Sequence, residues 1–273
     1  MHITEKLAAS IRHNKKLEHA SWLWKGVRPL YNKAVSLAGR SGLERVINGT
    51  DTVLVMPKHR AVTEEYEPDV WRALMAEVKS GDVVADVGTF IGLYTIALAK
   101  RVAPAGKVIA FEPHPINFAD LKEHVRLNSL AEIVEPIEAA IGANNCRVSF
   151  QLNSCESHIA SKGDGAAHDG MVEAECVTLD SVFAGKRCDL IKIDVEGYEE
   201  QVLQGASALL DDKARSPRAI FIEVHPHLWS PVGTTSESLI ALLSRHNYRV
   251  EFLNGSSVER IVEYGEVVAY KTS

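Results

Sequence analysis

Four side chains that can move a proton or hold a hydroxyl group lie in two short segments, "KIDVEG" and "IEVHP". They are Asp194, Glu196, Glu223 and His225. Each segment ends an apolar run that predicts a buried strand, and neighbouring parallel strands bring their carboxyl ends to the same edge of a sheet. Carboxylates and an imidazole in such a cleft are typical of acid–base chemistry on a hydroxyl group. We therefore predict that these residues are catalytic. Asp194 or His225 would accept the proton of the substrate hydroxyl, and the two glutamates would hold hydroxyl groups of the same substrate, called the acceptor below.

The segment "VVADVGTFIG" predicts a ligand held close to the main chain. Asp86 precedes Gly88, and Gly92 follows four residues later, where an apolar strand turns into a helix. Glycine lets the main chain approach a ligand closely. The spacing differs from the G-x-G-x-x-G of dinucleotide sites, and the Asp86 carboxylate would repel a pyrophosphate but attract the α-ammonium of S-adenosylmethionine. Together with Thr89 and Phe90 in the same turn, these residues are predicted to bind that cofactor.

Residues after the next two predicted strands complete an adenosine site. Glu112, in "VIAFEPHP", can accept hydrogen bonds from both ribose hydroxyls. Pro113 stiffens the turn, and Asn117 follows where it can flank an adenine. Ala139 and Ala140, in "IEAAIG", are small enough for a base to lie flat against them. Because NAD sites share the ribose contact, Glu112 supports an adenosine-containing ligand but does not distinguish NAD from S-adenosylmethionine.

The elements that must position these residues follow from the apolar periodicity. Strands are predicted near residues 83–87, 107–111, 133–138, 189–193, 219–224, 248–253 and 266–271. Helices are predicted near residues 68–79, 92–101, 115–128, 198–210 and 235–245. This alternation favours an α/β fold with a mainly parallel sheet and helices on both faces.

Two hairpins and a helical arm add to this core. "LERVINGTDTVLVMP" alternates around Asn48-Gly49, which is a strong hairpin signal. Residues 146–152 and 171–178 predict a second hairpin, inserted between the third and fourth core strands. Residues 3–38 carry apolar side chains at helical spacing and predict an N-terminal helical extension.

The start of the chain differs in charge from the rest. Residues 1–40 contain eight Lys and Arg against two Asp and Glu, whereas the remaining residues contain 22 against 34. The acidic residues 41–273 are unsuited to binding a nucleic acid. The basic residues 1–40, called the arm below, are a candidate for homo-oligomer formation or for docking on the rest of the chain. We divide the chain into residues 1–62, the arm and small hairpin, and residues 63–273, the cofactor-binding domain.

The location follows from the lack of long apolar segments. No apolar run approaches the roughly 20 residues of a membrane-spanning helix. The N-terminus has scattered charges and no continuous apolar core, so it is not typical of a secretory signal. We therefore expect no transmembrane segment and a cytoplasmic protein.

The motifs, taken in order, resemble a known family. "DVVADVGTFIGLYTIALAK", "GKVIAFEPHPINFADLKEHVRLN", "IEAAIG", "VTLDSV", "DLIKIDVEGYEEQVLQGA" and "IFIEVHP" are similar to segments of the FkbM-type S-adenosylmethionine-dependent methyltransferases. The resemblance covers about residues 64–253, and "IKIDVEG" after "FEP" is its most specific part. It implies a Rossmann-like, seven-stranded class I methyltransferase sheet and, usually, O-methylation of a sugar or polyketide-like metabolite. Thr89-Phe90 departs from the Ala-Asn that the family more often has there.

The resulting hypothesis is an S-adenosylmethionine-dependent O-methyltransferase that acts on a hydroxyl of a sugar, glycolipid or glycosylated or polyketide-like metabolite. Asp194 would then contact the cofactor as well. Acceptor-binding candidates are Glu65, Tyr66, His158 and Lys192, and Lys192 can also pair with one of the acids. Although Mg²⁺ accepts carboxylate ligands, methyl transfer to an alkyl hydroxyl does not require a metal, so we expect none. The alternatives are a dinucleotide-dependent oxidoreductase and a non-catalytic Rossmann-like binding protein.

Overall fold

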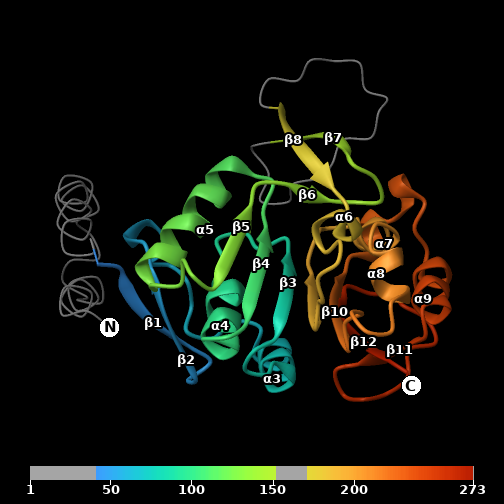
Figure 1. Ribbon diagram of the computed structural model, residues 1–273, viewed down its shortest axis with the longest axis horizontal. Coiled ribbons are helices and arrows are strands. Elements are labelled where there is room, and N and C mark those ends of the chain that lie inside the picture. Colours follow the sequence, from blue (N-terminus) through green and yellow to red (C-terminus); the bar gives the residue numbers. More distant parts are fainter. Residues whose placement is uncertain (1–40, 152–170, 273) are drawn as a thin grey trace, which may run out of the picture.

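Seven strands form the central sheet of the computed structural model, which describes residues 41–151 and 171–272. They are β3 (Val83–Val87), β4 (Lys107–Phe111), β5 (Val134–Ile137), β9 (Leu190–Ile193), β10 (Ala219–Val224), β11 (Tyr248–Phe252) and β12 (Gly265–Lys271). Their order is β11-β12-β10-β9-β3-β4-β5 (Figure 1). Neighbours from β10 to β5 are parallel, and β12 is antiparallel to β10 and β11. The predicted seven-stranded, Rossmann-like sheet is confirmed. The predicted arm, residues 1–40, lies outside the described residues.

Both faces of this sheet are buried. Successive side chains of a strand point to opposite faces, so in β9 Leu190 packs into one apolar cluster and Ile191 into the other. Every residue of β10 is buried. This explains why "AIFIEV" is a continuous apolar run rather than an alternation of polar and apolar residues.

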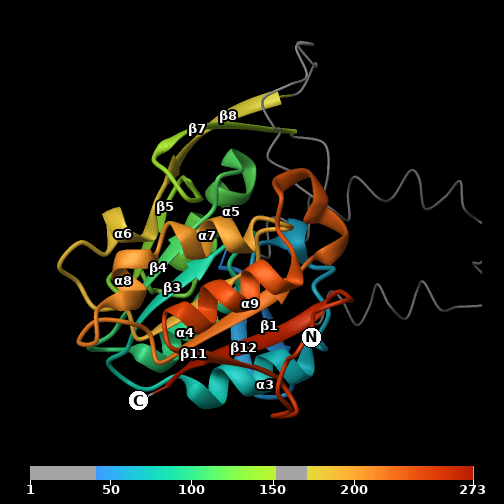
Figure 2. The ribbon, with the colours of Figure 1, turned by 90° about the vertical axis from the view of Figure 1, so that its right-hand side faces the viewer.

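Helices cover the two faces in separate groups. One group is α3 (Pro68–Glu77), α4 (Leu93–Val102) and α5 (Pro115–Leu127), and the other is α6 (Leu179–Val182), α7 (Glu199–Gln204), α8 (Ser207–Asp211) and α9 (Ser236–Arg245). Figure 2 shows α7, α8 and α9 together on one side of the sheet. In the described part of the chain, none of the helices is long and apolar enough to cross a membrane.

The predicted insertion forms a small sheet of its own. β7 (Cys146–Gln151) and β8 (Met171–Val177) pair antiparallel, and β6 (Ala140–Ile141) joins β8 in parallel. The sequence predicts the hairpin but not β6, because two residues are too few for a periodic pattern. Ala140 lies opposite Cys176 in this pairing, so the insertion is joined directly to a predicted cofactor-binding residue.

The same region explains the break between α7 and α8, where the sequence predicts one helix. A Cβ atom at Gly205 would lie only 2.0 Å from the carbonyl oxygen of Gly142. The loop between β6 and β7 therefore packs against the end of α7. Such tertiary contact is invisible to a local propensity argument.

The predicted N-terminal hairpin consists of β1 (Leu43–Ile47) and β2 (Asp51–Val55). Asn48 and Gly49 take positive φ angles of 49° and 70°, as a tight hairpin turn demands. Apolar side chains of both strands belong to the same cluster as α4 and α5. The hairpin thus shares a core with the residues that follow it, and the division of the chain near residue 62 stays a prediction.

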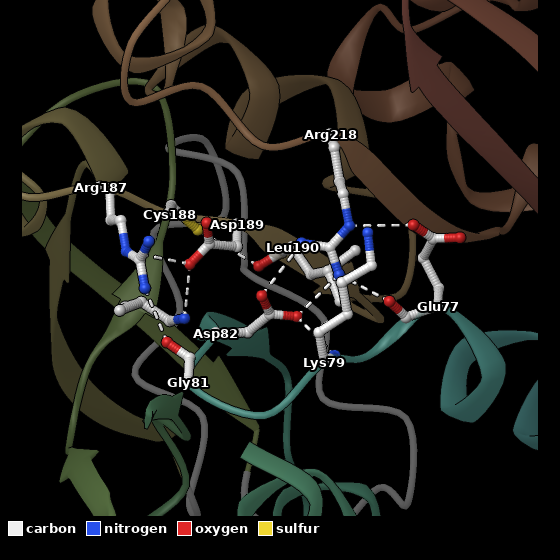
Figure 3. A network of polar contacts seen from close by, with 10 residues as sticks. Glu77, Lys79, Gly81, Asp82, Arg187, Cys188, Asp189, Leu190 and Arg218 are labelled. Carbon is white, nitrogen blue, oxygen red and sulfur yellow. Dashed lines mark hydrogen bonds and ion pairs between the residues drawn. The ribbon is translucent and has the colours of Figure 1, made fainter. Parts of the chain in front are cut away.

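A polar network ties together the residues just before β3, β9 and β10 (Figure 3). Arg218 Nη2 donates to Asp82 Oδ2 at 2.7 Å, and Arg218 Nε donates to Glu77 Oε1 at 2.9 Å. Asp189 Oδ2 accepts from the N–H of Val83 at 2.7 Å. Because Asp82 is buried, Arg218 supplies the charged partner that its carboxylate needs. The amino ends of these strands are joined here, opposite the ends that carry the predicted site.

Candidate functional site

A cavity of about 560 Å³ lies at the carboxyl ends of the parallel strands. Its volume is in the usual range for small-molecule sites. The predicted site residues that line it are Tyr66, Gly88, Phe90, Glu112, Pro113, Asn117, Ala139, Ala140, Asp194, Glu196, Glu223 and His225. The structure therefore brings the predicted cofactor end and the predicted acceptor end into one cavity.

The other predicted residues within 41–151 and 171–272 do not line this cavity. Thr89 and Gly92 are buried within the turn after β3. Glu65 lines a second hollow, beside Trp71 and Arg101. His158 lies outside the described residues. The roles predicted for these residues stay predictions.

The turn after β3 has the close approach that its glycine predicts. Gly88 has a φ of 83°, and a Cβ atom there would lie 1.8 Å from the carbonyl oxygen of Asp194. A larger residue would have to push the loop after β9 away. The buried hydroxyl of Thr89 has no hydrogen-bond partner within residues 41–151 and 171–272, so a polar ligand group beside this turn would satisfy it.

Glu112, at the end of β4, is held as a hydrogen-bond acceptor. Oε2 accepts from the N–H of Phe90 at 2.8 Å, and Oε1 accepts from the N–H of His114 at 2.9 Å. Burial raises the pKa of Glu112 to about 7, although these two hydrogen bonds lower it. The side chain of Asn117 also donates to this carboxylate, which leaves about one of its roughly four acceptor positions for a ribose hydroxyl.

Asp86 is buried and does not line the cavity. Its Oδ2 accepts a hydrogen bond of 2.6 Å from Thr95 Oγ1. Burial raises the pKa of Asp86, and the nearby charge of Lys192 lowers it. The cofactor contact of Asp86 therefore stays a prediction, and its placement favours an electrostatic role over direct contact.

Lys192 is buried in mid-strand and holds Asp194. Its Nζ lies 3.2 Å from Asp194 Oδ2 and 4.6 Å from the centroid of the Tyr94 ring. Burial lowers the pKa of Lys192, but the surrounding carboxylates, Asp194 foremost, raise it above its ordinary value. The expected pairing of this lysine with an acid is confirmed, whereas its contact with an acceptor stays a prediction.

His225 is oriented by Glu199, an acid that the sequence analysis does not single out. Nδ1 of His225 lies 2.8 Å from Glu199 Oε1, and Glu199 Oε2 accepts from Trp229 Nε1 at 2.8 Å. Burial lowers the pKa of His225, but the carboxylates of Glu199, Asp194 and Glu223 together raise it by more, so the net shift is upward. On the other side of the ring, Nε2 lies 3.8 Å from Glu223 Oε1. The imidazole is therefore held between two carboxylates.

Further side chains complete the acceptor end. The cavity is also lined by Glu67, Tyr198, His227, Leu228 and Tyr264. Tyr264 donates a hydrogen bond to Glu223, and Tyr94 donates to Glu67 at 2.8 Å. Burial raises the pKa of Glu223, and the charge of Asp194 raises it further. Glu199 lies inside the segment "DLIKIDVEGYEEQVLQGA", and Glu67 adjoins the predicted residue Tyr66, whereas Tyr264 has no local signal.

The turn after β9 is conformationally unusual. Glu196 and Gly197 both take positive φ angles, 46° and 97°. A Cβ atom at Gly197 would lie 2.7 Å from that of Leu228. Non-glycine residues in the left-handed region cluster at functional sites, which agrees with the placement of Glu196 on the cavity wall.

Comparison with solved structures gives low similarity scores. Methyltransferase FkbM from Methylobacillus flagellatus has a TM-score of 0.45 and 18% identity, and the match covers 70% of this chain and 43% of that one. The chain thus spans less than half of that protein. A putative rRNA-methylase from Clostridium thermocellum has a TM-score of 0.48 and 14% identity, covering 74% of this chain and 93% of that one.

Curated relatives and a family model give a clearer result. The hexuronic acid methyltransferase AglP of Haloferax volcanii is 29% identical over 189 residues, 68% of this chain and 71% of that protein. The 31-O-demethyl-FK506 methyltransferase FkbM of Streptomyces tacrolimicus is 28% identical over 204 residues, 64% of this chain and 75% of that protein. The model described as the methyltransferase FkbM domain matches residues 86–250. Since this match covers more than half of the chain, the chain belongs to the FkbM methyltransferase family.

Proposed function

We propose that this chain transfers the methyl group of S-adenosylmethionine to a hydroxyl of a sugar, a glycolipid or a glycosylated or polyketide-like metabolite. One observation carries the proposal: a single cavity joins the Gly88 and Glu112 end to a polar end formed by Asp194, Glu223 and His225. Membership of a methyltransferase family argues against the dinucleotide-dependent oxidoreductase and the non-catalytic binding protein.

The residues at the first end fit S-adenosylmethionine. Glu112 retains an acceptor position for a ribose hydroxyl, and Ala139 and Ala140 line the cavity without large side chains. Gly88 keeps the main chain open to the ligand, and the Thr89 hydroxyl lacks a partner that the ligand would supply. When bound, the cofactor supplies a methyl group on a positively charged sulfur. The role of the protein is then to hold an acceptor oxygen in line with that methyl group.

The second end suits an acceptor rich in hydroxyl groups. Asp194 is fixed by Lys192, Glu223 by Tyr264, and His225 by Glu199. Such pre-oriented groups can receive hydroxyl hydrogen bonds and stabilise the loss of the hydroxyl proton. The names of two relatives, one for a hexuronic acid and one for a 31-O position, support a sugar-like or hydroxyl acceptor.

The test is a screen of candidate acceptors with methyl-labelled cofactor, followed by mass-spectrometric location of the label. We expect label on an oxygen. With a confirmed acceptor, Asp194→Asn and His225→Ala should each reduce turnover about 100-fold or more, because each removes a group that acts on the hydroxyl. Cofactor affinity of the His225 variant should change little, since its contacts are at the acceptor end.

Two results would contradict the proposal. One is label on nitrogen or carbon, and the other is full turnover in both variants. Calorimetry with S-adenosylmethionine and with NAD tests the cofactor separately, and binding of NAD alone would refute the cofactor assignment.

A further inference from the structure

Three side chains at the acceptor end form a compact set of possible metal ligands. Asp194, Glu223 and His225 each offer one ligand atom, and these atoms lie within 4.8 Å of one another. Glu223 and His225 are buried, whereas Asp194 is half-buried and faces the cavity. Three protein ligands beside an open cavity are typical of catalytic metal sites, which keep positions free for water or substrate.

The imidazole is prepared as a ligand. A histidine that binds a metal through one nitrogen almost always donates from the other to a carboxylate or carbonyl group, which sets its tautomer and its orientation. Here Nδ1 of His225 is bonded to Glu199 Oε1, and that carboxylate is fully buried. Glu199 is itself fixed, because Oε1 also accepts from the N–H of Gly197 at 2.9 Å and Oε2 accepts from Trp229. The bond to Glu199 assigns the Nδ1 proton, so Nε2 is the nitrogen that can bind a metal ion once its own proton is lost.

The position of Nε2 suits a positive charge, because its nearest acid is Glu223, with Oε1 at 3.8 Å. Either a proton on Nε2 or a metal ion bound to it can supply that charge, and a metal ion would bind by displacing the proton. Several acids gather around this point, since the carboxylates of Asp194 and Glu223 both face the cavity beside His225. A divalent cation would offset part of the cost of holding two carboxylates so close together.

Lys192 leaves room for such a cation. Its ammonium group binds Oδ2 of Asp194 and lies against the ring of Tyr94. One of the two oxygens of Asp194 is thereby used, and the other is available as a metal ligand. The lysine therefore orients this carboxylate without occupying the whole of it.

We propose that Asp194, Glu223 and His225 bind one divalent metal ion of the Mn²⁺ or Mg²⁺ type, with Glu199 as the positioning residue for His225. Two carboxylates and one imidazole suit such hard to borderline cations, which take several further oxygen ligands. With a metal ion on Nε2, His225 would be a ligand and not the base, and the remaining metal positions would accept water or hydroxyl groups of the acceptor. Metal binding itself does not depend on the proposed function, but its role in holding the acceptor does. The expectation from the sequence that no metal takes part is untested, and this proposal opposes it.

The test uses the full chain, stripped with a chelator and titrated with Mn²⁺ in the absence of cofactor and acceptor. Electron paramagnetic resonance should record the uptake of one ion per chain, and spin-echo modulation should show a coordinated imidazole nitrogen. His225→Ala should abolish that modulation. Glu223→Gln and Glu199→Gln should weaken binding, the latter by about 10- to 100-fold, as expected for an outer-shell partner.

The controls separate loss of the site from loss of the fold. Glu135→Gln removes an exposed carboxylate of β5 that does not line the cavity, and it should bind Mn²⁺ like the unchanged chain. Binding of S-adenosylmethionine by Glu223→Gln and Glu199→Gln shows that these variants are folded. The inference is overturned if the unchanged chain takes up no Mn²⁺, or if uptake survives all three substitutions at the site. Oxygen methylation that continues in excess chelator, with no Mn²⁺ uptake, would overturn the metal site and leave the proposed function standing.

Discussion

Gly88→Ala tests whether the turn after β3 lies as close to the loop after β9 as the cofactor assignment requires. The new Cβ atom would lie 1.8 Å from the carbonyl oxygen of Asp194. The positive φ of 83° adds roughly 1–2 kcal/mol of backbone strain, and relief of the overlap by a shift of the loop adds about 1–3 kcal/mol. We therefore expect the free energy of unfolding to fall by about 2–5 kcal/mol. The displaced turn should also weaken S-adenosylmethionine binding at least tenfold.

A matched control separates the strain from the overlap. Gly255 has a φ of 80° with no atom within 4 Å of a built Cβ, so Gly255→Ala carries the strain alone. Chemical unfolding should show a loss of about 1–2 kcal/mol for this control, and calorimetry should show unchanged cofactor affinity. If Gly88→Ala matches Gly255→Ala in stability and binds S-adenosylmethionine like the unchanged chain, the reasoning about this turn is wrong.

Four further predictions concern the cofactor, the network before the strands and the arm. Glu112→Gln should weaken S-adenosylmethionine binding about 10- to 100-fold at pH 8, since a hydrogen bond to a charged group is worth about 1.5–3 kcal/mol. Because the pKa of Glu112 is about 7, cofactor affinity of the unchanged chain should fall as the pH drops from 8 to 6, and a flat calorimetric profile would contradict this. Arg218→Ala should lower the free energy of unfolding by about 1–3 kcal/mol, because it leaves the buried Asp82 without its charged partner; unchanged urea unfolding would show that the network does not contribute. A chain that begins at Ser41 should bind S-adenosylmethionine normally but differ in light scattering or acceptor turnover, and identity with the full chain in both would refute the role predicted for residues 1–40.

Much of the fold is predictable because each core strand carries its own local signal. Apolar runs of strand length alternate with amphipathic helices, and the structure has β3, β4 and β10 at the predicted bounds. The two-residue strand β6 and the break at Gly205 depend instead on contact with the inserted sheet. Local sequence patterns do not reveal such tertiary contacts.

The site is predictable to the extent that its residues end strands. Glu112, Asp194 and Glu223 follow or end apolar runs, and the parallel topology brings them to one cavity. Glu199 is on a helix and Tyr264 precedes the antiparallel strand β12, so only the tertiary structure brings them to His225 and Glu223. The cytoplasmic location, the lack of a nucleic-acid partner and homo-oligomer formation through the arm stay predictions.

The polar network and the cavity occupy opposite ends of the same strands, which has a consequence for protein engineering. A five-residue strand such as β3 is about 17 Å long, so substitutions near Arg218 and substitutions near His225 have no shared contacts and should act almost additively. Stability gained around Asp82 and Asp189 can therefore compensate for destabilising changes made to alter acceptor choice. Laboratory evolution of a new acceptor would do well to begin from a variant strengthened at the amino ends of the sheet.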